Sequence, residues 1–162
     1  MDPLWERLGR QAVVTEAARQ LQVAYCAAFD RADREALLPL FDPDAVFRRP
    51  DSVCAGRAAI LDFYEHLWAA GTRPTRHFPV VVEVDEIGER LLRVRTSYFL
   101  ILGHGDDLYV GWGDYDDRVA VGPQGLVFVA KTSTIEGLVR AEGGWGRASR
   151  TPPPWLPGRK TP

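Results

Sequence analysis

The feature that most constrains the fold is a series of strand patterns that fills the second half of the chain. Residues 77–88 ("HFPVVVEVDEIG") and 89–105 ("ERLLRVRTSYFLILGHG") are rich in β-branched and aromatic residues and alternate between apolar and polar positions. Residues 106–121 and 126–135 continue the series, and "GPQG" marks a turn between them. Because short turns join antiparallel neighbours, the series predicts a meander of long strands with one buried face.

Three helical patterns precede this sheet. Residues 12–30 contain no Gly or Pro and place apolar residues at helical spacing. Residues 33–40 predict a short second helix with Asp33 as its cap, and 56–71 predict a third that ends at Gly71. A short strand is expected around Ala45–Arg48. Helices first and strands afterwards indicate an α+β fold, with a curved antiparallel sheet wrapped on the helices.

Length and composition limit the possible classes of protein. A chain of 162 residues is long enough for one domain, expected over 1–137, with a Gly- and Pro-rich tail over 138–162. A net charge of -2 gives no basic surface for nucleic acid, and no apolar run is long enough to span a membrane. The opening "MDPLWERLGRQ" lacks a signal-peptide pattern, so we expect a cytoplasmic protein.

The sequence also argues against several kinds of site. Cys26 and Cys54 are too few for a disulfide framework or a zinc site, and no other cluster has convincing metal-ligand spacing. A Ser nucleophile elbow, a phosphate-binding loop and a dinucleotide fingerprint are all absent from the sequence. The residues left as candidates for chemistry are Asp30 and His77.

His77 opens the first long strand, in "RHFPVVVEV". In a regular strand, Phe78, Val80, Val82 and Val84 share one face, so His77 would point away from a core on that face. Pro79 cannot donate to the ladder and favours an edge or a bulge. A bulge of one residue at this point would turn His77 toward the core. A catalytic role for His77 therefore requires an irregular strand near Pro79.

Asp30 ends the first predicted helix, where a carboxylate lies at the unfavourable end of the helix dipole. It is either a solvated turn residue or a carboxylate that orients an imidazole and raises its basicity. On the second long strand, alternation from Leu92 to Leu102 puts the hydroxyl of Tyr98 inside.

The order of these segments resembles a known family. The strings "AYCAAFDRADREALLPLFDPDAVFRRPD", "CAGRAAILDFYEHLW" and "TRHFPVVVEVD" are similar to the SnoaL-like group of the nuclear-transport-factor-2-like superfamily, over about residues 12–135. The resemblance implies a cone-shaped α+β fold with an apolar pocket, usually dimeric and usually without metal or organic cofactor. By motif position it also implies that Asp30 and His77 form the catalytic pair.

These features lead to two expectations about function. The first is a cofactor-independent lyase or isomerase, of the dehydratase or cyclase type, that acts on an apolar carbonyl compound such as a polyketide or aromatic intermediate. In it, Tyr25, Tyr98 and Lys131 (or Arg150 in the tail) would bind the substrate oxygen. The apolar walls would come from Phe47, Tyr64, Trp68 and Trp112. The alternative is a noncatalytic binding or structural subunit of the same fold. We also expect a homodimer through the sheet, and a tail whose Trp145 and Trp155 fold over the pocket entrance.

Overall fold

The computed structural model describes residues 3–71, 75–104, 107–122 and 125–141. The helices are α1 (Pro3–Arg31), α2 (Arg34–Leu37), a one-turn 3-10 helix (Leu38–Leu40) and α3 (Arg57–Ala69). The strands are β1 (Phe41–Arg49), β2 (Ser52–Ala55), β3 (Thr75–Gly88), β4 (Leu91–His104), β5 (Asp107–Gly122) and β6 (Gly125–Ala141).

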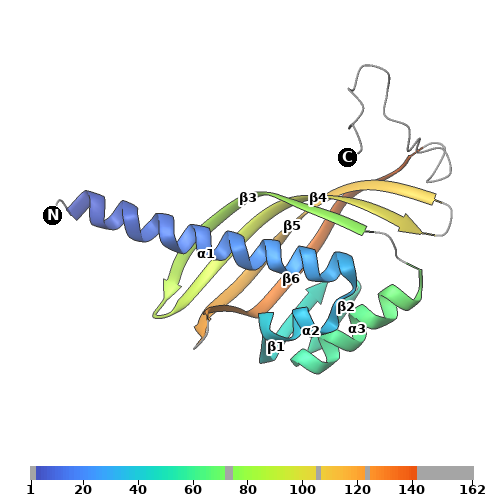
Figure 1. Ribbon diagram of the computed structural model, residues 1–162, viewed down its shortest axis with the longest axis horizontal. Helices are drawn as coiled ribbons and strands as arrows, with labels where there is room; N and C mark the ends of the chain where they lie inside the picture. The colour runs from blue at the N-terminus through green and yellow to red at the C-terminus, as the bar shows by residue number, and fades with distance from the viewer. Residues whose placement is uncertain (1–2, 72–74, 105–106, 123–124, 142–162) are drawn as a thin grey trace, which may run out of the picture.

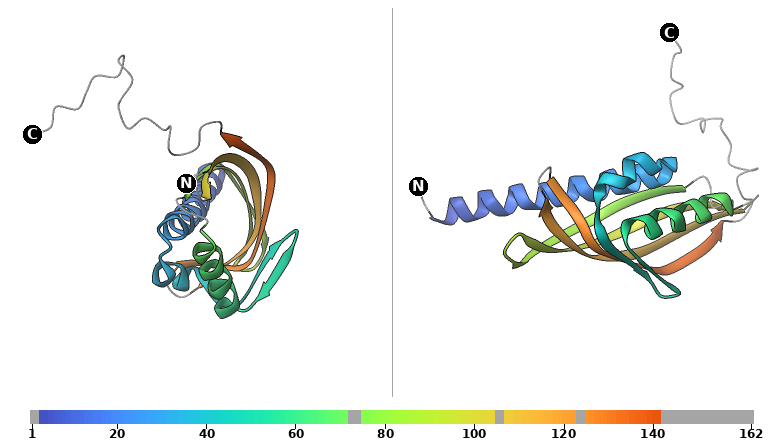
Figure 2. Two further views of the ribbon diagram at one scale, coloured as in Figure 1. Left: turned by 90° about the vertical axis from the view of Figure 1, so that its right-hand side faces the viewer. Right: turned by 90° about the horizontal axis from the view of Figure 1, so that it is seen from below.

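The six strands form one open, curved sheet in the order β2-β1-β6-β5-β4-β3. All neighbouring strands are antiparallel except β1 and β6, which are parallel. The long helix α1 lies along the concave side of the sheet (Figure 1), and the end-on view shows the sheet curling around α1 and α3 (Figure 2). The predicted α+β class and the cone-like wrapping of the sheet around the helices are confirmed.

Several boundaries differ from the sequence prediction. Helix α1 begins at Pro3 instead of residue 12. Its added turns are exposed, so they have no buried apolar face from which the sequence could predict them. The hairpin of β1 with β2 was not predicted, because β2 has only four residues. Strand β6 continues to Ala141, past the expected domain end at Gly137, because its last residues pair with the start of β5. The tail over 142–162, with Trp145, Arg150 and Trp155, lies outside the described residues.

The predicted bulge in β3 is present. His77 pairs with Leu100 and Pro79 with Tyr98, but the next pair joins Val81 to Ser97, so Val80 is the extra residue. Tyr98 and Leu100 belong to the buried face of β4, which alternates as predicted. Because a single extra residue reverses the alternation, His77 lies on the inner face of the sheet.

Candidate active site

A cavity of about 300 Å³ opens between the helices and the inner face of the sheet. This volume is at the lower end of the range for small-molecule sites. Its walls come from α1, β1, α3 and β3–β6, so every layer of the fold contributes. The lining residues are mostly aromatic and aliphatic: Tyr25, Phe29, Phe47, Arg49, Phe63, Tyr64, Leu67, Thr75, His77, Tyr98, Leu100, Leu102, Tyr115, Ser133, Ile135 and Leu138.

Asp30 and His77 are joined by two hydrogen bonds. The Asp30 Oδ1 atom lies 2.7 Å from His77 Nδ1, and the backbone N–H of His77 donates to Asp30 Oδ2 over 2.8 Å. Helix α1 ends directly after Asp30, since Ala32 adopts a left-handed conformation with φ of 53°. The two side chains are 8% and 11% exposed. The end of α1 and the bulged start of β3 therefore hold the pair in a fixed orientation out of bulk water.

This geometry assigns the proton on the imidazole. Burial raises the pKa of the Asp30 carboxyl, but the hydrogen bonds and charge of His77 outweigh it and hold that pKa below its ordinary value. Asp30 is therefore ionised at neutral pH and can only accept, so His77 Nδ1 is the donor, and in the neutral imidazole the lone pair is on Nε2. Nε2 forms no hydrogen bond with the residues that the structure describes. His77 lines the cavity, whereas Asp30 lies behind it.

Tyrosine hydroxyl groups surround the inner end of the cavity. The hydroxyls of Tyr25 and Tyr64 lie 3.1 Å apart, and because one bond uses one hydrogen, the pair retains a second hydrogen to donate. Tyr98 donates to the backbone carbonyl of Thr134 over 3.2 Å. Burial raises the pKa of Tyr25, Tyr64 and Tyr98, so these groups remain neutral donors at neutral pH.

Lys131, which was expected to bind the substrate oxygen, faces inward but lies too deep to line the cavity. Its Nζ atom donates to Asp117 Oδ2 at 2.9 Å and to Gln22 Oε1 at 3.3 Å. The same atom lies 3.6 Å from the ring centroid of Tyr115 and 4.2 Å from that of Tyr25. Lys131 is thus a wholly buried cation behind the aromatic wall, at distances typical of cation–π contacts.

Only some of the residues that were predicted to form the apolar walls line the cavity. Phe47 and Tyr64 line the cavity. Trp68 packs against Phe29 and Tyr64 with ring centroids 5.7 and 6.3 Å apart, but it is outside the lining. Trp112 lies on the outer face and is 42% exposed, because the neighbouring inward positions of β5 are glycines. The structure therefore does not bring Trp112 to the cavity.

Arg49, Phe29 and Ser133 also line the cavity and were not predicted as site residues. The signal for Arg49 was present, since it follows the predicted wall residue Phe47 by two positions and shares its face of the strand. Ser133 could have been found in the same way from Lys131 on β6. Phe29 lies beside Asp30, and its ring packs edge-on against His77 at 5.3 Å.

Two other kinds of site find no support within the described part of the chain. No three His, Cys, Asp or Glu side chains among those residues gather closely enough to hold a metal ion. Burial raises the pKa of the Cys26 thiol to about 12, so this thiol is protonated at neutral pH and is a poor nucleophile.

No helix in the described ranges is both long and apolar enough to cross a membrane.

Residues 11–151 match the SnoaL-like domain family, and the chain belongs to that family. No curated protein is significantly similar to it in sequence.

Solved structures with the same fold include three with informative names. A provisionally named scytalone dehydratase from Novosphingobium aromaticivorans is 23% identical, with a TM-score of 0.72 over 85% of this chain and 97% of that one. The hexachlorocyclohexane dehydrochlorinase LinA-type3 from Novosphingobium barchaimii is 13% identical, with a TM-score of 0.73 and coverages of 86% and 94%. The β subunit of a provisionally named aromatic-ring-hydroxylating dioxygenase from N. aromaticivorans is 17% identical, with a TM-score of 0.67 and coverages of 79% and 92%.

Proposed function

We propose that the protein is a cofactor-independent lyase or isomerase, of the dehydratase or cyclase type, and that Asp30 and His77 are its catalytic pair. The substrate is an apolar carbonyl compound such as a polyketide or aromatic intermediate. The observation that carries the proposal is the double hydrogen bond from His77 to Asp30, which engages Nδ1 and leaves Nε2 as the ring nitrogen available beside an aromatic cavity. An oriented, buried imidazole of this kind is suited to general-base catalysis.

In this reaction His77 Nε2 removes a proton from the carbon next to the carbonyl group. The electron pair of the broken C–H bond moves into an enolate, and Asp30 stabilises the imidazolium that forms. The spare hydroxyl hydrogen of the Tyr25 and Tyr64 pair donates to the enolate oxygen. Expulsion of a leaving group from the adjacent carbon completes an elimination, and return of the proton to another carbon completes an isomerisation. Lys131 does not line the cavity, so its charge affects the enolate oxygen only indirectly, through the tyrosine rings that it contacts.

Exchange of substrate protons with solvent tests this function directly. His77 and Asp30 also border a shallow groove on the outer side, with Arg76 and Pro79, through which the imidazole proton can reach water. We expect the protein to catalyse deuterium incorporation next to the carbonyl group of aromatic ketones in D₂O, measured by NMR. A His77→Ala variant should lose this activity. Absence of exchange across a broad panel of such ketones would contradict the proposed chemistry.

A noncatalytic role is the second candidate, because one structure with this fold is named as a dioxygenase subunit. The same assay separates the two functions. A binding domain would bind apolar ligands without catalysing exchange, and Asp30→Asn would then leave ligand affinity unchanged.

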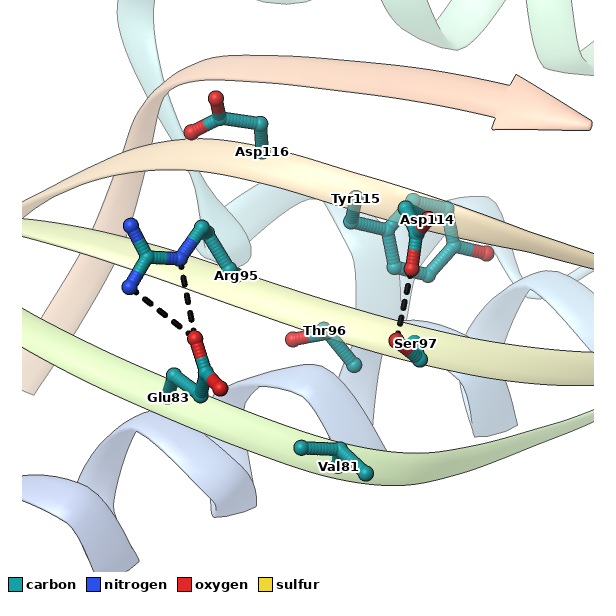
Figure 3. Close-up of a pocket in the computed structure, with 8 residues that line it drawn as sticks. All are labelled: Val81, Glu83, Arg95, Thr96, Ser97, Asp114, Tyr115 and Asp116. Carbon is teal, nitrogen blue, oxygen red and sulfur yellow. Dashed lines mark hydrogen bonds and ion pairs between the residues drawn. The ribbon is translucent and has the colours of Figure 1, made fainter.

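We also propose that the protein forms a homodimer through the outer face of the sheet. Phe78, Phe99 and Trp112 lie opposite one another on β3, β4 and β5, and they are 50%, 52% and 42% exposed. Beside this aromatic row is a shallow charged hollow, where Arg95 contacts Glu83 and Ser97 donates to Asp114 (Figure 3). Arg95 is paired with Glu83 and the Asp114 carboxylate accepts from Ser97, so these polar groups have partners at the edge of the apolar row.

The oligomeric state tests this surface. Light scattering at micromolar concentration should give about twice the mass of the 18.1 kDa chain. Phe99→Asp should shift the protein to the monomer, since the added carboxylate would be buried in the apolar row. Val13→Asp is a matched control, because Val13 is 70% exposed on α1. A monomeric wild-type protein, or a dimer that survives Phe99→Asp, would rule out this interface.

A further inference from the structure

The cavity lining contains a cationic side chain, and the anion that pairs with it lies outside the lining. Arg49 is the single Arg or Lys among the lining residues that the structure describes, and those residues include no Asp or Glu. The other polar groups in the lining are hydroxyls of Tyr, Thr and Ser, together with His77. A cavity with this lining is electropositive and favours a ligand with an anionic group.

Arg49 reaches the cavity from the end of β1. Alternation along β1 places it on the same inner face as Phe47. The parallel pairing of Arg48 with Thr132 on β6 puts the next residues, Arg49 and Ser133, side by side in the lining. The strands that carry Arg49 and His77 are not neighbours in the sheet, so the cation and the base lie on different walls of one cavity.

The guanidinium of Arg49 is held along one edge. Nε lies 3.2 Å from Asp51 Oδ1, and Nη2 lies 3.5 Å from Asp51 Oδ2. The face of the group lies over the Phe63 ring, 5.7 Å from its centroid. The Asp51 side chain is 68% exposed, so water screens this ion pair and weakens it. Nη1 has no hydrogen-bond partner within the described ranges.

We infer that Arg49 binds a carboxylate of the substrate. This inference deepens the proposed function by naming the substrate class: an apolar, ring-containing carboxylic acid. The carboxylate accepts from Arg49 Nη1, and Ser133, whose hydroxyl lies 3.5 Å from that of Tyr98, is the polar neighbour of Arg49 in the lining. The apolar part lies against the aromatic wall, which directs the far end of the molecule toward His77. Because the carboxylate is charged before reaction, Arg49 contributes to binding as well as to turnover.

The test compares two probes that differ in charge, 2-naphthoate and its neutral amide 2-naphthamide, by titration calorimetry at low ionic strength. The wild-type protein should bind the carboxylate at least about tenfold more tightly, as expected for a charge-assisted hydrogen bond in a partly buried site. Arg49→Met should abolish the preference, and Arg49→Lys should retain part of it. Arg48→Met is the matched control, since Arg48 is exposed on the opposite face of the same strand. Circular dichroism checks that each variant is folded.

The outcomes separate this inference from the proposed reaction. His77→Ala should keep the carboxylate preference, because neither Asp30 nor His77 takes part in binding the carboxylate. A wild-type protein that prefers the carboxylate but catalyses no exchange would contradict the proposed reaction and leave the role of Arg49 intact. Equal affinity for the two probes, no binding of either, or a preference that persists in Arg49→Met would overturn the role of Arg49.

Discussion

Replacing His77 by alanine is expected to lower turnover by about 10²-fold or more, the usual effect of removing a positioned general base. The variant should remain folded, because it loses only the Nδ1 bond to Asp30 and ring contacts with Phe29 and Tyr98, while the backbone N–H of residue 77 still donates to Asp30. Initial rates of deuterium exchange, measured beside thermal melting curves, give both quantities. His66→Ala is the matched control, since His66 is an exposed residue on α3.

Asp30→Asn should lower turnover to a similar extent for a different reason. The amide keeps the shape of the carboxylate but cannot stabilise a positively charged imidazole, so the base is weakened while its position is retained. The pKa of Asp30 lies below its ordinary value in the folded protein, so the carboxylate stabilises the fold above that ordinary value. This contribution is lost as the pH falls through the lowered pKa. The melting temperature of the Asp30→Asn variant should therefore fall less than that of the wild-type protein as the pH is lowered.

Both predictions depend on the same assignment. Near-wild-type exchange rates in folded His77→Ala and Asp30→Asn proteins would show that the pair is structural. A loss of exchange in His66→Ala would show that the assay responds to histidine replacements in general.

The second large effect is on stability. Lys131→Met should lower the free energy of unfolding by about 3–5 kcal/mol, the range for removing one partner of a buried ion pair. Lys131 and Asp117 are both fully buried, and the substitution leaves the Asp117 carboxylate without its cation. Two other donors to Asp117 remain, Gln22 Nε2 at 2.6 Å and the backbone N–H of Thr132 at 3.3 Å. They offset only part of the loss. Guanidinium chloride denaturation measures the change.

A double variant separates the charge from the packing. Lys131→Met combined with Asp117→Leu removes both buried charges, and it should recover most of the lost stability. Arg118→Met is the control for loss of an exposed cation, since Arg118 is exposed on β5 next to Asp117. If Lys131→Met unfolds at the wild-type denaturant concentration, or the double variant is no more stable than the single one, the buried pair does not have the role assigned to it.

The sequence by itself determined the features that depend on neighbouring residues. The alternation of β4 placed Tyr98 on the inner face, and Pro79 indicated an edge or a bulge; the bulge that turns His77 inward is present. Both follow from the two-residue period of a strand and from the missing donor of proline. The helix cap at Asp33 is equally local, since its side chain accepts from the backbone N–H of Ala36.

Only the tertiary structure decided which of these residues meet. Asp30 and His77 are 47 residues apart, and their contact depends on how α1 crosses the curved sheet. The expectation that Lys131 would bind the substrate oxygen did not specify its depth, and the structure buries this residue behind the wall, whereas Arg49 is in the lining. A strand pattern specifies a side, whereas depth depends on the curvature of the whole sheet and on the helices packed inside it. The sequence therefore singled out His77, the proposed general base, and missed Arg49 on a different wall of the same cavity.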